Sequence, residues 1–434
     1  MNGAAPERHL GRWRLVAVGI NAVIGGGIFI LPASVTALVG PAALYAYLVA
    51  GAVVLGIGLA LASLAARFDA SGGPYLYVQR SFGDLPGFVV GWLFCLARLT
   101  AMANLMNGFA LYLGALLPGG GGAALRALFV LVCATGVVGI NIAGIRRTAA
   151  ASNLLAVAKI LPLVIVGGAG LLLLAPARFA AEPFAPVDFL RAVLLLIFAF
   201  TGFEIVSVPA EESLHPRRDI PFALLATIGT VGVIYLLVHT ALLGMLPGLG
   251  RETAPLATAA GLLAGPAGRY GMTGLAALSI AGCTLISLVG ASRLMYAMSA
   301  SGQIPRPLGA LGLRSRAPVT ACLIMGGPAA ALAITSRYEA LAAVSTGSRL
   351  LVYLACCFAC LRGGASGGVR ARGLARIAVA RLAPVLTAAA IVALLFGLEP
   401  REAVGGIIGV GAGLALYMAA RRGQSTVRPQ EESR

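Results

Sequence analysis

The chain has 434 residues, of which 59% are hydrophobic and only 11% are charged, and its mean hydropathy is +0.94. These proportions leave too few polar residues to cover a water-soluble globule of this size, so they exclude a soluble fold and predict a protein of the lipid bilayer. The net charge of +17 does not indicate nucleic-acid binding, because the arginines are dispersed over many short loops.

About twelve apolar runs approach or exceed the roughly 18 to 25 residues that a bilayer-spanning helix needs. They are rich in Leu and Ala and lack the period-2 alternation of a lipid-facing strand, which disfavours a barrel. We therefore expect an all-helical integral membrane protein with about 12 transmembrane helices. The runs cover approximately 15–38, 42–66, 87–117, 125–143, 151–174, 190–210, 222–246, 271–298, 318–335, 339–361, 377–396 and 402–420.

The arginines outside these runs suggest an orientation. If the N-terminus is cytoplasmic, 21 of them fall on the inner side and 7 on the outer side. The positive-inside rule then places both termini, residues 1–14 and 421–434, in the cytoplasm. The first run is longer than the apolar core of a signal peptide and other spans follow it, so it is expected to be retained. We expect a multi-pass protein of the plasma membrane, which in bacteria is the inner membrane.

The first span contains an unusual helix centre, NAVIGGGIFILPA (21–33), in which three consecutive glycines are followed five residues later by Pro32. Each glycine costs roughly 1 kcal/mol relative to alanine in a helix, and the proline removes one more backbone hydrogen bond. Non-helical backbone at membrane depth is tolerated where it lines a cavity or is buried by protein. Tight packing of small residues between helices is the alternative explanation.

The fifth span carries Lys159, the one lysine among 32 basic residues; every other one is arginine. If this span begins near Ala151, Lys159 lies roughly 12 Å along it at 1.5 Å per residue. A buried ammonium can lose its proton, whereas a guanidinium stays charged. Lysine at this position therefore suggests a group that must deprotonate, and the alternative is a lysine that snorkels to the cytoplasmic surface.

The sixth span repeats the pattern of the first in FAFTGFEIVSVPAEE (198–212), where Gly202 is followed by Glu204 and Pro209. Matched broken helices in the two halves of a chain are typical of secondary transporters with inverted repeats, which bind substrate near the membrane midplane. Glu204 is the only acidic residue expected deep inside a span, which suggests a functional carboxylate. Its alternative role is that of a structural partner for an intramembrane arginine.

Several stretches together resemble motifs of the amino acid, polyamine and organocation transporter family, and the chain is identified as a bacterial amino acid permease of that kind. They are IGGGIF (24–29), SGGPYLYVQRSFGDLPGFVVGW (71–92), FAFTGFEIVSVPAEESLHPRRDIP (198–221), ASRLMYAMSASGQIP (291–305) and, more weakly, SRLLVY (348–353). The resemblance implies a five-plus-five inverted repeat, residues 15–174 and 190–361, with two added helices in 377–420. It also implies alternating access at a central site, with an amino acid as the small-molecule substrate and no cofactor.

In the family, the free N–H groups of the glycine-rich break hold the carboxylate of the substrate, which here suggests Gly26 and Gly27. This agrees with the partial positive charge and unpaired donors of a helix N-terminus. The ammonium of the substrate is expected on the carbonyl of Val23 and on the break in the sixth span, where Phe198 matches an aromatic position that closes over the substrate. The full expected substrate set is Val23, Gly25, Gly26, Gly27, Phe198, Ala199, Thr201 and Arg98.

Two arginines depart from the commonest pattern of the family, Arg98 in the third span and Arg349 in the tenth. Either they cap carbonyls freed at the helix breaks, or one of them faces the pocket and favours a substrate with an acidic side chain. Arg98 is the candidate for the second role, because in relatives this position falls near the side chain of the substrate.

The resemblance also suggests how transport is coupled. In some proton-coupled relatives a lysine of the fifth span takes the place of a bound cation between the first and eighth spans, and Lys159 matches that position. Thr284 and Ser287 of the eighth span are its expected hydroxyl neighbours, and Glu204 matches a position linked to gating and proton handling.

Other functions remain alternatives at this point. An exchanger or exporter of amino acids or polyamines without proton coupling, a channel and a substrate sensor could all use this fold. A membrane enzyme is disfavoured, because His9, His215 and His239 are far apart and show no metal-site spacing. The seven cysteines all fall inside predicted spans and are expected to be small apolar packing residues.

Overall fold

The computed structural model describes residues 11–68, 73–117, 122–143, 159–180, 182–207, 213–310, 312, 318–363 and 381–425. Within these ranges the regular secondary structure is helical, and seven helical stretches are long and apolar enough to cross a membrane. The protein is therefore an all-helical, multi-pass membrane protein, as the composition predicts. The sequence-based expectations for residues 1–10, 151–158, Pro209 and 426–434 concern positions outside the described residues.

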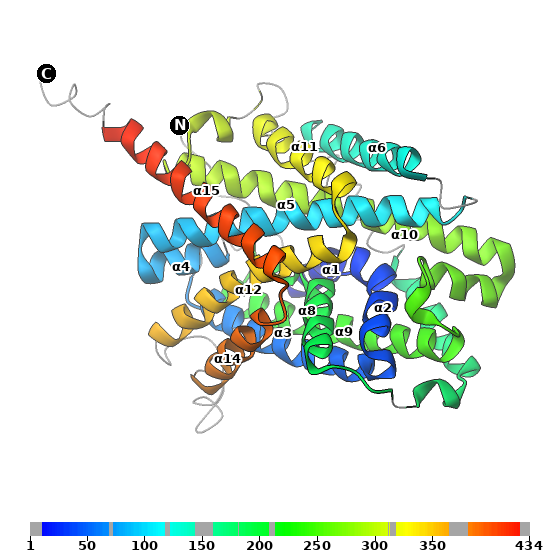
Figure 1. The fold of residues 1–434 in the computed structure, drawn as a ribbon. Helices are drawn as coiled ribbons and strands as arrows, with labels where there is room; N and C mark the ends of the chain where they lie inside the picture. Colours follow the sequence, from blue (N-terminus) through cyan, green and yellow to red (C-terminus); the bar gives the residue numbers. More distant parts are fainter. Residues whose placement is uncertain are drawn as a thin grey trace, which may run out of the picture.

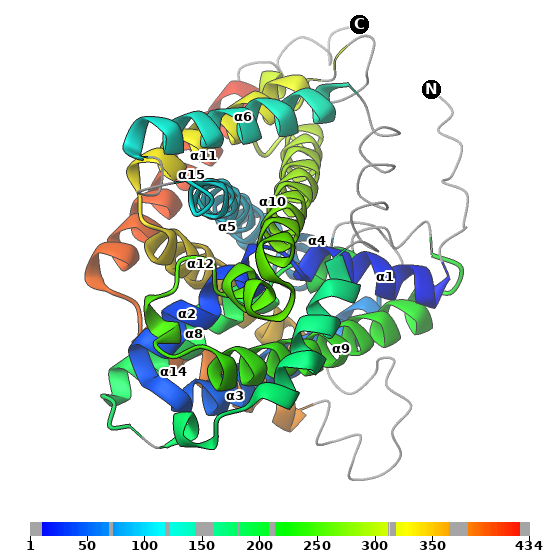
Figure 2. The same ribbon diagram turned by 90° about the vertical axis from the view of Figure 1, so that its right-hand side faces the viewer.

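One group of helices forms the lower part of the molecule in Figure 2. It packs through a continuous apolar core of buried Leu, Ile, Val, Ala and aromatic side chains. Its members contact one another along their lengths. They are α1 (Arg12–Val23), α2 (Gly26–Val39), α3 (Ala43–Ala65), α8 (Pro186–Phe200) and α9 (Pro216–Met245).

A second group lies across the first and has a core of its own. It contains α5 (Asp84–Gly114), α6 (Gly122–Ile142), α10 (Pro255–Ala300) and α11 (Val319–Thr335), of which α5 contacts the other three. The helix α12 (Tyr338–Arg362) joins the two groups, because it packs on α5 as well as on α3 and α8. The remaining elements are α4 (Pro74–Phe82), the helical stretch Lys159–Leu173, α14 (Ala383–Leu395) and α15 (Pro400–Ser425).

The first span is broken between α1 and α2, at Ile24 and Gly25. Both residues leave helical geometry, with φ −70° and ψ 89° at Ile24 and φ −130° and ψ −145° at Gly25. Pro32 lies inside α2 without interrupting it, so the interruption falls at the start of the glycine motif and not at the proline. The break frees backbone groups in the middle of the molecule.

The sixth span is broken after α8, where Thr201 and Gly202 form a turn before the short 3₁₀ helix η5 (Phe203–Ser207). Gly202 has φ +114°, a region that residues with a Cβ atom rarely adopt. It also lies against the other break, because a Cβ atom on Gly202 would stand 2.6 Å from the carbonyl oxygen of Ala22. The two interruptions therefore touch each other.

The eighth span differs from its expected start at residue 271. Helical structure already begins at Pro255, and α10 runs to Ala300 with a kink at Ala264 and Gly265. Gly265 has φ +63°, and Pro266 follows it as the first residue after the kink. Proline is favoured at the first position of a helix, so Pro266 suits the start of the helical segment that follows the kink.

Replacing Gly202 by alanine is expected to damage the fold at the contact between the two breaks. The left-handed backbone at this position and the collision with Ala22 together should cost about 1–3 kcal/mol, seen as a lower melting temperature of the purified protein in detergent. Gly229→Ala in α9 is the matched control, since a Cβ atom there meets open space and alanine favours helix. Equal melting temperatures for both variants would contradict the contact.

Candidate functional site

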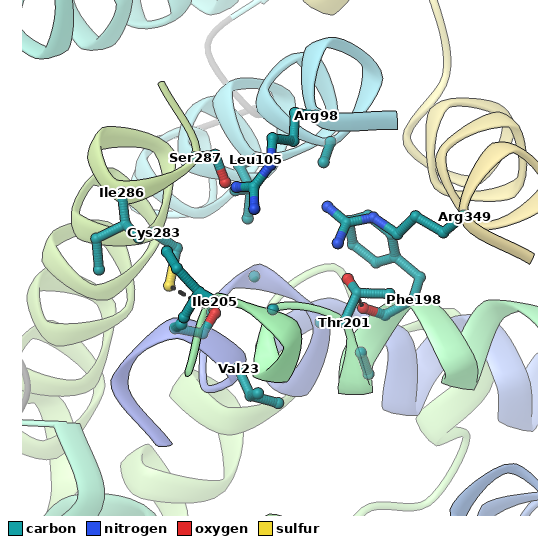
Figure 3. A pocket seen from close by; sticks show the side chains of 17 residues that line it. Val23, Arg98, Leu105, Phe198, Thr201, Ile205, Cys283, Ile286, Ser287 and Arg349 are labelled. Atoms are coloured by element: carbon teal, nitrogen blue, oxygen red, sulfur yellow. Dashed lines mark hydrogen bonds between the residues drawn. The ribbon is translucent and has the colours of Figure 1, made fainter. Parts of the chain in front are cut away.

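A pocket lies where the two helix breaks meet α5, α10 and α12 (Figure 3). It therefore sits between the two groups of helices, and each group supplies part of its wall. The lining residues are Ala22, Val23, Gly25, Gly26, Gly27, Arg98, Ala101, Leu105, Phe198, Ala199, Thr201, Gly202, Ile205, Cys283, Ile286, Ser287 and Arg349. All eight residues of the expected substrate set are among them.

The three glycines of the first break allow three different helices to approach. A Cβ atom on Gly25 would lie 2.8 Å from Sγ of Cys283 in α10, and one on Gly26 would lie 2.9 Å from Leu105 in α5. A Cβ atom on Gly27 would lie 2.7 Å from Cα of Ala199 in α8. The glycine motif is therefore explained by close packing as well as by the break, so both explanations offered by the sequence apply.

The helix α2 begins at Gly26, and its first N–H groups have no partner within the helix. Because Gly26 and Gly27 also line the pocket, donors and the positive end of a helix dipole lie at its wall. An anionic group of a ligand would be stabilised there.

Tyr235 of α9 contacts a backbone carbonyl of each helix break. Its hydroxyl lies 3.1 Å from the carbonyl oxygen of Val23 and 3.0 Å from that of Ala199. A hydroxyl has one proton to donate, so it satisfies one of these carbonyls at a time. The other carbonyl is left to accept from another donor, such as an ammonium group in the pocket.

Lys159 lies behind the first break and is 1% exposed. Its Nζ atom donates to the carbonyl oxygens of Asn21 and Ile24, at 2.6 Å in both cases. The side chain therefore points to the interior and satisfies carbonyls freed by the break. This geometry differs from that of a lysine that snorkels to the membrane surface.

The neighbours of Lys159 on α10 differ from the expected pair. Sγ of Cys283 lies 3.7 Å from Nζ, and Ser279 donates to the carbonyl of Ile24 at 3.3 Å. Thr284 instead donates to Ile280 of its own helix, and Ser287 lies in the pocket wall. Cys283 is therefore a neighbour of the buried amine in addition to being the packing residue that the sequence predicted.

Glu204 is fully buried, and its carboxylate accepts from a guanidinium and from the backbone. Arg349 of α12, 3% exposed, forms a salt bridge with Oε1, and the N–H of Gly202 donates to Oε2 at 2.9 Å. Glu204 thus holds the turn of the second break and neutralises Arg349. The structural role that the sequence left open for Glu204 is the one seen in these contacts.

Arg98 of α5 reaches the pocket from the wall opposite the two helix breaks (Figure 3). Its guanidinium stacks 4.7 Å above the ring centroid of Phe94, and the guanidinium of Arg349 lies 5.8 Å from the same ring. Such cation–π contacts hold and orient arginine side chains. Phe94 therefore contacts and helps to orient both positive groups.

Sequence reasoning missed Tyr235, Phe94 and Cys283. An aromatic residue or a cysteine in an apolar span carries no motif of its own, and the rotation of each helix relative to the breaks is set by interhelical packing. A faint signal existed for Tyr235, because a hydroxyl in the interior of a span needs a hydrogen-bond partner.

This fold and pocket define a class: membrane proteins with two broken helices around a central pocket. Comparison with known proteins supports the assignment to this class. The chain matches the family described as amino acid permease over residues 10–416. An uncharacterized transporter of Mycobacterium tuberculosis is 31% identical to it, over 96% of this chain and 92% of the relative.

Two further relatives have names that state what they transport. The branched-chain amino acid permease of Bacillus subtilis is 27% identical, over 75% of this chain and 74% of the relative. The gamma-aminobutyric acid permease of Escherichia coli is 29% identical, over 82% of this chain and 79% of the relative. The chain belongs to the amino acid permease family, which confirms the membership that the sequence motifs indicated.

Replacing Glu204 by glutamine should destabilise the protein strongly, because it leaves the buried Arg349 without a counter-charge. Removing one partner of a buried ion pair costs about 3–5 kcal/mol, measured here as a fall in melting temperature. The double variant Glu204→Gln, Arg349→Met should recover part of that loss.

The matched control is the surface pair of Arg191 and Glu399, whose side chains are 27% and 48% exposed. Glu399→Gln should change stability by no more than about 1 kcal/mol. If Glu204→Gln has the same small effect, the buried pair does not hold the second break.

Proposed function

We propose that the protein is a secondary active transporter that moves amino acids across the plasma membrane by alternating access, coupled to protons through Lys159. The observation that carries this proposal is the pair of 2.6 Å hydrogen bonds from Lys159 to the carbonyls of Asn21 and Ile24, directly beside the pocket. The family membership and the named substrates of the relatives suggest the substrate class.

The surroundings of Lys159 suit both protonation states of its amine. A protonated amine has three donors, of which two reach carbonyls and the third faces Cys283. A neutral amine keeps two donors for the carbonyls and gains a lone pair, to which the weakly donating thiol of Cys283 can turn. Lys159 can therefore release its proton without leaving the carbonyls of Asn21 and Ile24 unpaired, which an arginine could not do at physiological pH.

The pocket has complementary groups for both ends of an amino acid. The N–H groups of Gly26 and Gly27 suit the carboxylate. The carbonyls of Val23 and Ala199 share one hydroxyl proton from Tyr235, so one of them is open to the ammonium. Phe198 is 5% exposed and lines the pocket, which suits the proposed role of an aromatic cover.

The grouping of helices supports a five-plus-five inverted repeat, residues 15–174 and 190–361. The first two spans of each expected repeat, α1/α2 with α3 and α8 with α9, lie together in one group. The next two of each, α5 with α6 and α10 with α11, form the other. Relative movement of two such groups around the pocket would open it to one side of the membrane at a time, with α14 and α15 as the added helices.

The arginine distribution supports the proposed orientation. With both termini in the cytoplasm, the inner loops and tails carry 21 of the non-membrane arginines and the outer loops 7. Accessibility of single cysteines introduced into the tails of a cysteine-free variant would test it in intact cells.

Lys159→Ala should abolish amino acid accumulation driven by a pH gradient in proteoliposomes, while substrate binding stays measurable. The reason is that no group remains at the first break to take up and release the proton. Lys159→Arg should lose accumulation too, because a guanidinium donates to the carbonyls but does not deprotonate.

Leu161→Ala is the control for these variants, since Leu161 lies on the same helix and is 65% exposed. A Lys159→Ala protein that still concentrates substrate on a pH gradient would disprove the coupling. Counterflow adds a separate test of the carrier mechanism: a carrier preloaded with unlabelled substrate accelerates labelled uptake, and a channel does not.

Tyr235→Phe should weaken substrate binding by about 5- to 30-fold, because it removes the hydroxyl that holds the carbonyls of both breaks in place. Tyr112→Phe is the matched control, since the Tyr112 hydroxyl also donates to the first span, at Phe29, 2.6 Å away, but outside the pocket. Binding is measured by isothermal titration in detergent. A larger loss with Tyr112→Phe than with Tyr235→Phe would count against the bridging role.

A further inference from the structure

Arg98 is buried beside the pocket, and no carboxylate of the described residues forms an ion pair with its guanidinium. It is 4% exposed, and its guanidinium is confined between the ring of Phe94 and the backbone at Gly290, where a Cβ atom would lie 2.6 Å from Nη1. No hydrogen bond or ion pair reaches Arg98 from any described residue, and its Nε atom is buried without an acceptor. The rest of the guanidinium faces the pocket.

The charges around the pocket do not balance. Glu204 forms its salt bridge with Arg349 and accepts from the N–H of Gly202, and its charge also acts on Arg98. One carboxylate then faces two guanidinium groups, so a surplus positive charge remains even when Lys159 is neutral. A lone charge within a membrane protein is costly unless something neutralises it. Among the described residues, no carboxylate lines the pocket, which indicates that a ligand brings the negative charge.

Arg98 and the glycine N–H groups lie at different places in the pocket wall. Along α5, Arg98, Ala101 and Leu105 line the pocket, and Leu105 is the residue that packs against Gly26. Seven residues of helix separate Leu105 from Arg98, or about 10 Å between their backbones. A ligand with a carboxylate at the N-terminus of α2 would therefore reach toward Arg98 with its side chain.

We propose that the substrate carries a second carboxylate on its side chain, as aspartate and glutamate do, and that Arg98 binds it. A guanidinium matches a carboxylate with two parallel hydrogen bonds, and burial strengthens that pair. This inference rests on the proposed function, since it names the class of amino acid that the same pocket takes.

The test compares acidic amino acids with their neutral amides, which have the same shape. Thermal shift and counterflow are measured with aspartate, glutamate, asparagine and glutamine on the full-length protein. The wild-type protein should bind the acids at least about 30-fold more tightly than the amides, and Arg98→Gln should abolish that preference. Arg191→Gln, which removes a positive charge outside the pocket, should leave it intact.

Arg98→Lys keeps the charge but not the paired geometry, so it should retain a reduced preference, and it serves as the reporter if Arg98→Gln does not fold. A preference for the amides or for apolar amino acids would overturn the proposal. So would an equal loss for acids and amides in Arg98→Gln, or stabilisation by chloride alone equal to that by the acids. If no amino acid exchanges at all, the transport function itself fails, whereas exchange of neutral amino acids alone refutes only the acidic substrate.

Discussion

Two interruptions of the backbone inside the membrane set the conditions for the rest of the structure. A broken helix exposes carbonyl and N–H groups where water is scarce, and each unpaired group is costly. The donors that meet this need come from separate elements: Lys159 at Asn21 and Ile24, and Tyr235 at Val23 and Ala199. The same interruptions leave N–H groups at the start of α2 unpaired at the pocket wall. These are the groups that we propose bind the substrate carboxylate.

The charged residues in and beside the pocket are of two kinds: one ion pair that stabilises the fold, and two basic residues outside that pair. Arg349 and Glu204 satisfy each other and fix the second break to α12. Lys159 and Arg98 have no carboxylate partner among the described residues, and they lie on different sides of the pocket. In the proposed cycle, uptake of a proton charges Lys159 and its release neutralises it, whereas the substrate neutralises Arg98. In this proposal, the net charge in and around the pocket depends on both the proton and the substrate.

Local chemistry in the sequence predicted the class of fold and the two helix breaks, and the resemblance to the transporter family suggested eight of the residues that line the pocket. Long apolar runs predict membrane helices, consecutive glycines predict a break, and an isolated lysine in an apolar run indicates a buried amine. The structure has the helix breaks near Gly25 and Gly202 and a buried Lys159. The functional roles of these residues stay predictions.

What the sequence could not provide was the rotation of one helix against another. Neighbouring residues of a helix differ by about 100° in direction, so Cys283 faces Lys159 while Thr284 donates to its own helix. Tyr235 was missed for the same reason, since its partners lie on α1 and α8. The partner of Arg349 was open too, because which acid meets which arginine depends on how α12 packs on the second break.

The first break places the proposed proton site and the proposed substrate site on one short backbone segment. The carbonyl of Ile24 faces Lys159, and the N–H groups of Gly26 and Gly27 begin the α2 helix two residues later. A change in charge on Lys159 acts on the Ile24 carbonyl, whose orientation is linked through Gly25 to the donors that face the pocket. Gly25 also packs directly on Cys283, the other neighbour of the amine. Coupling between proton and substrate then requires no distant relay, because a rotation within residues 24–26 alters both sites together.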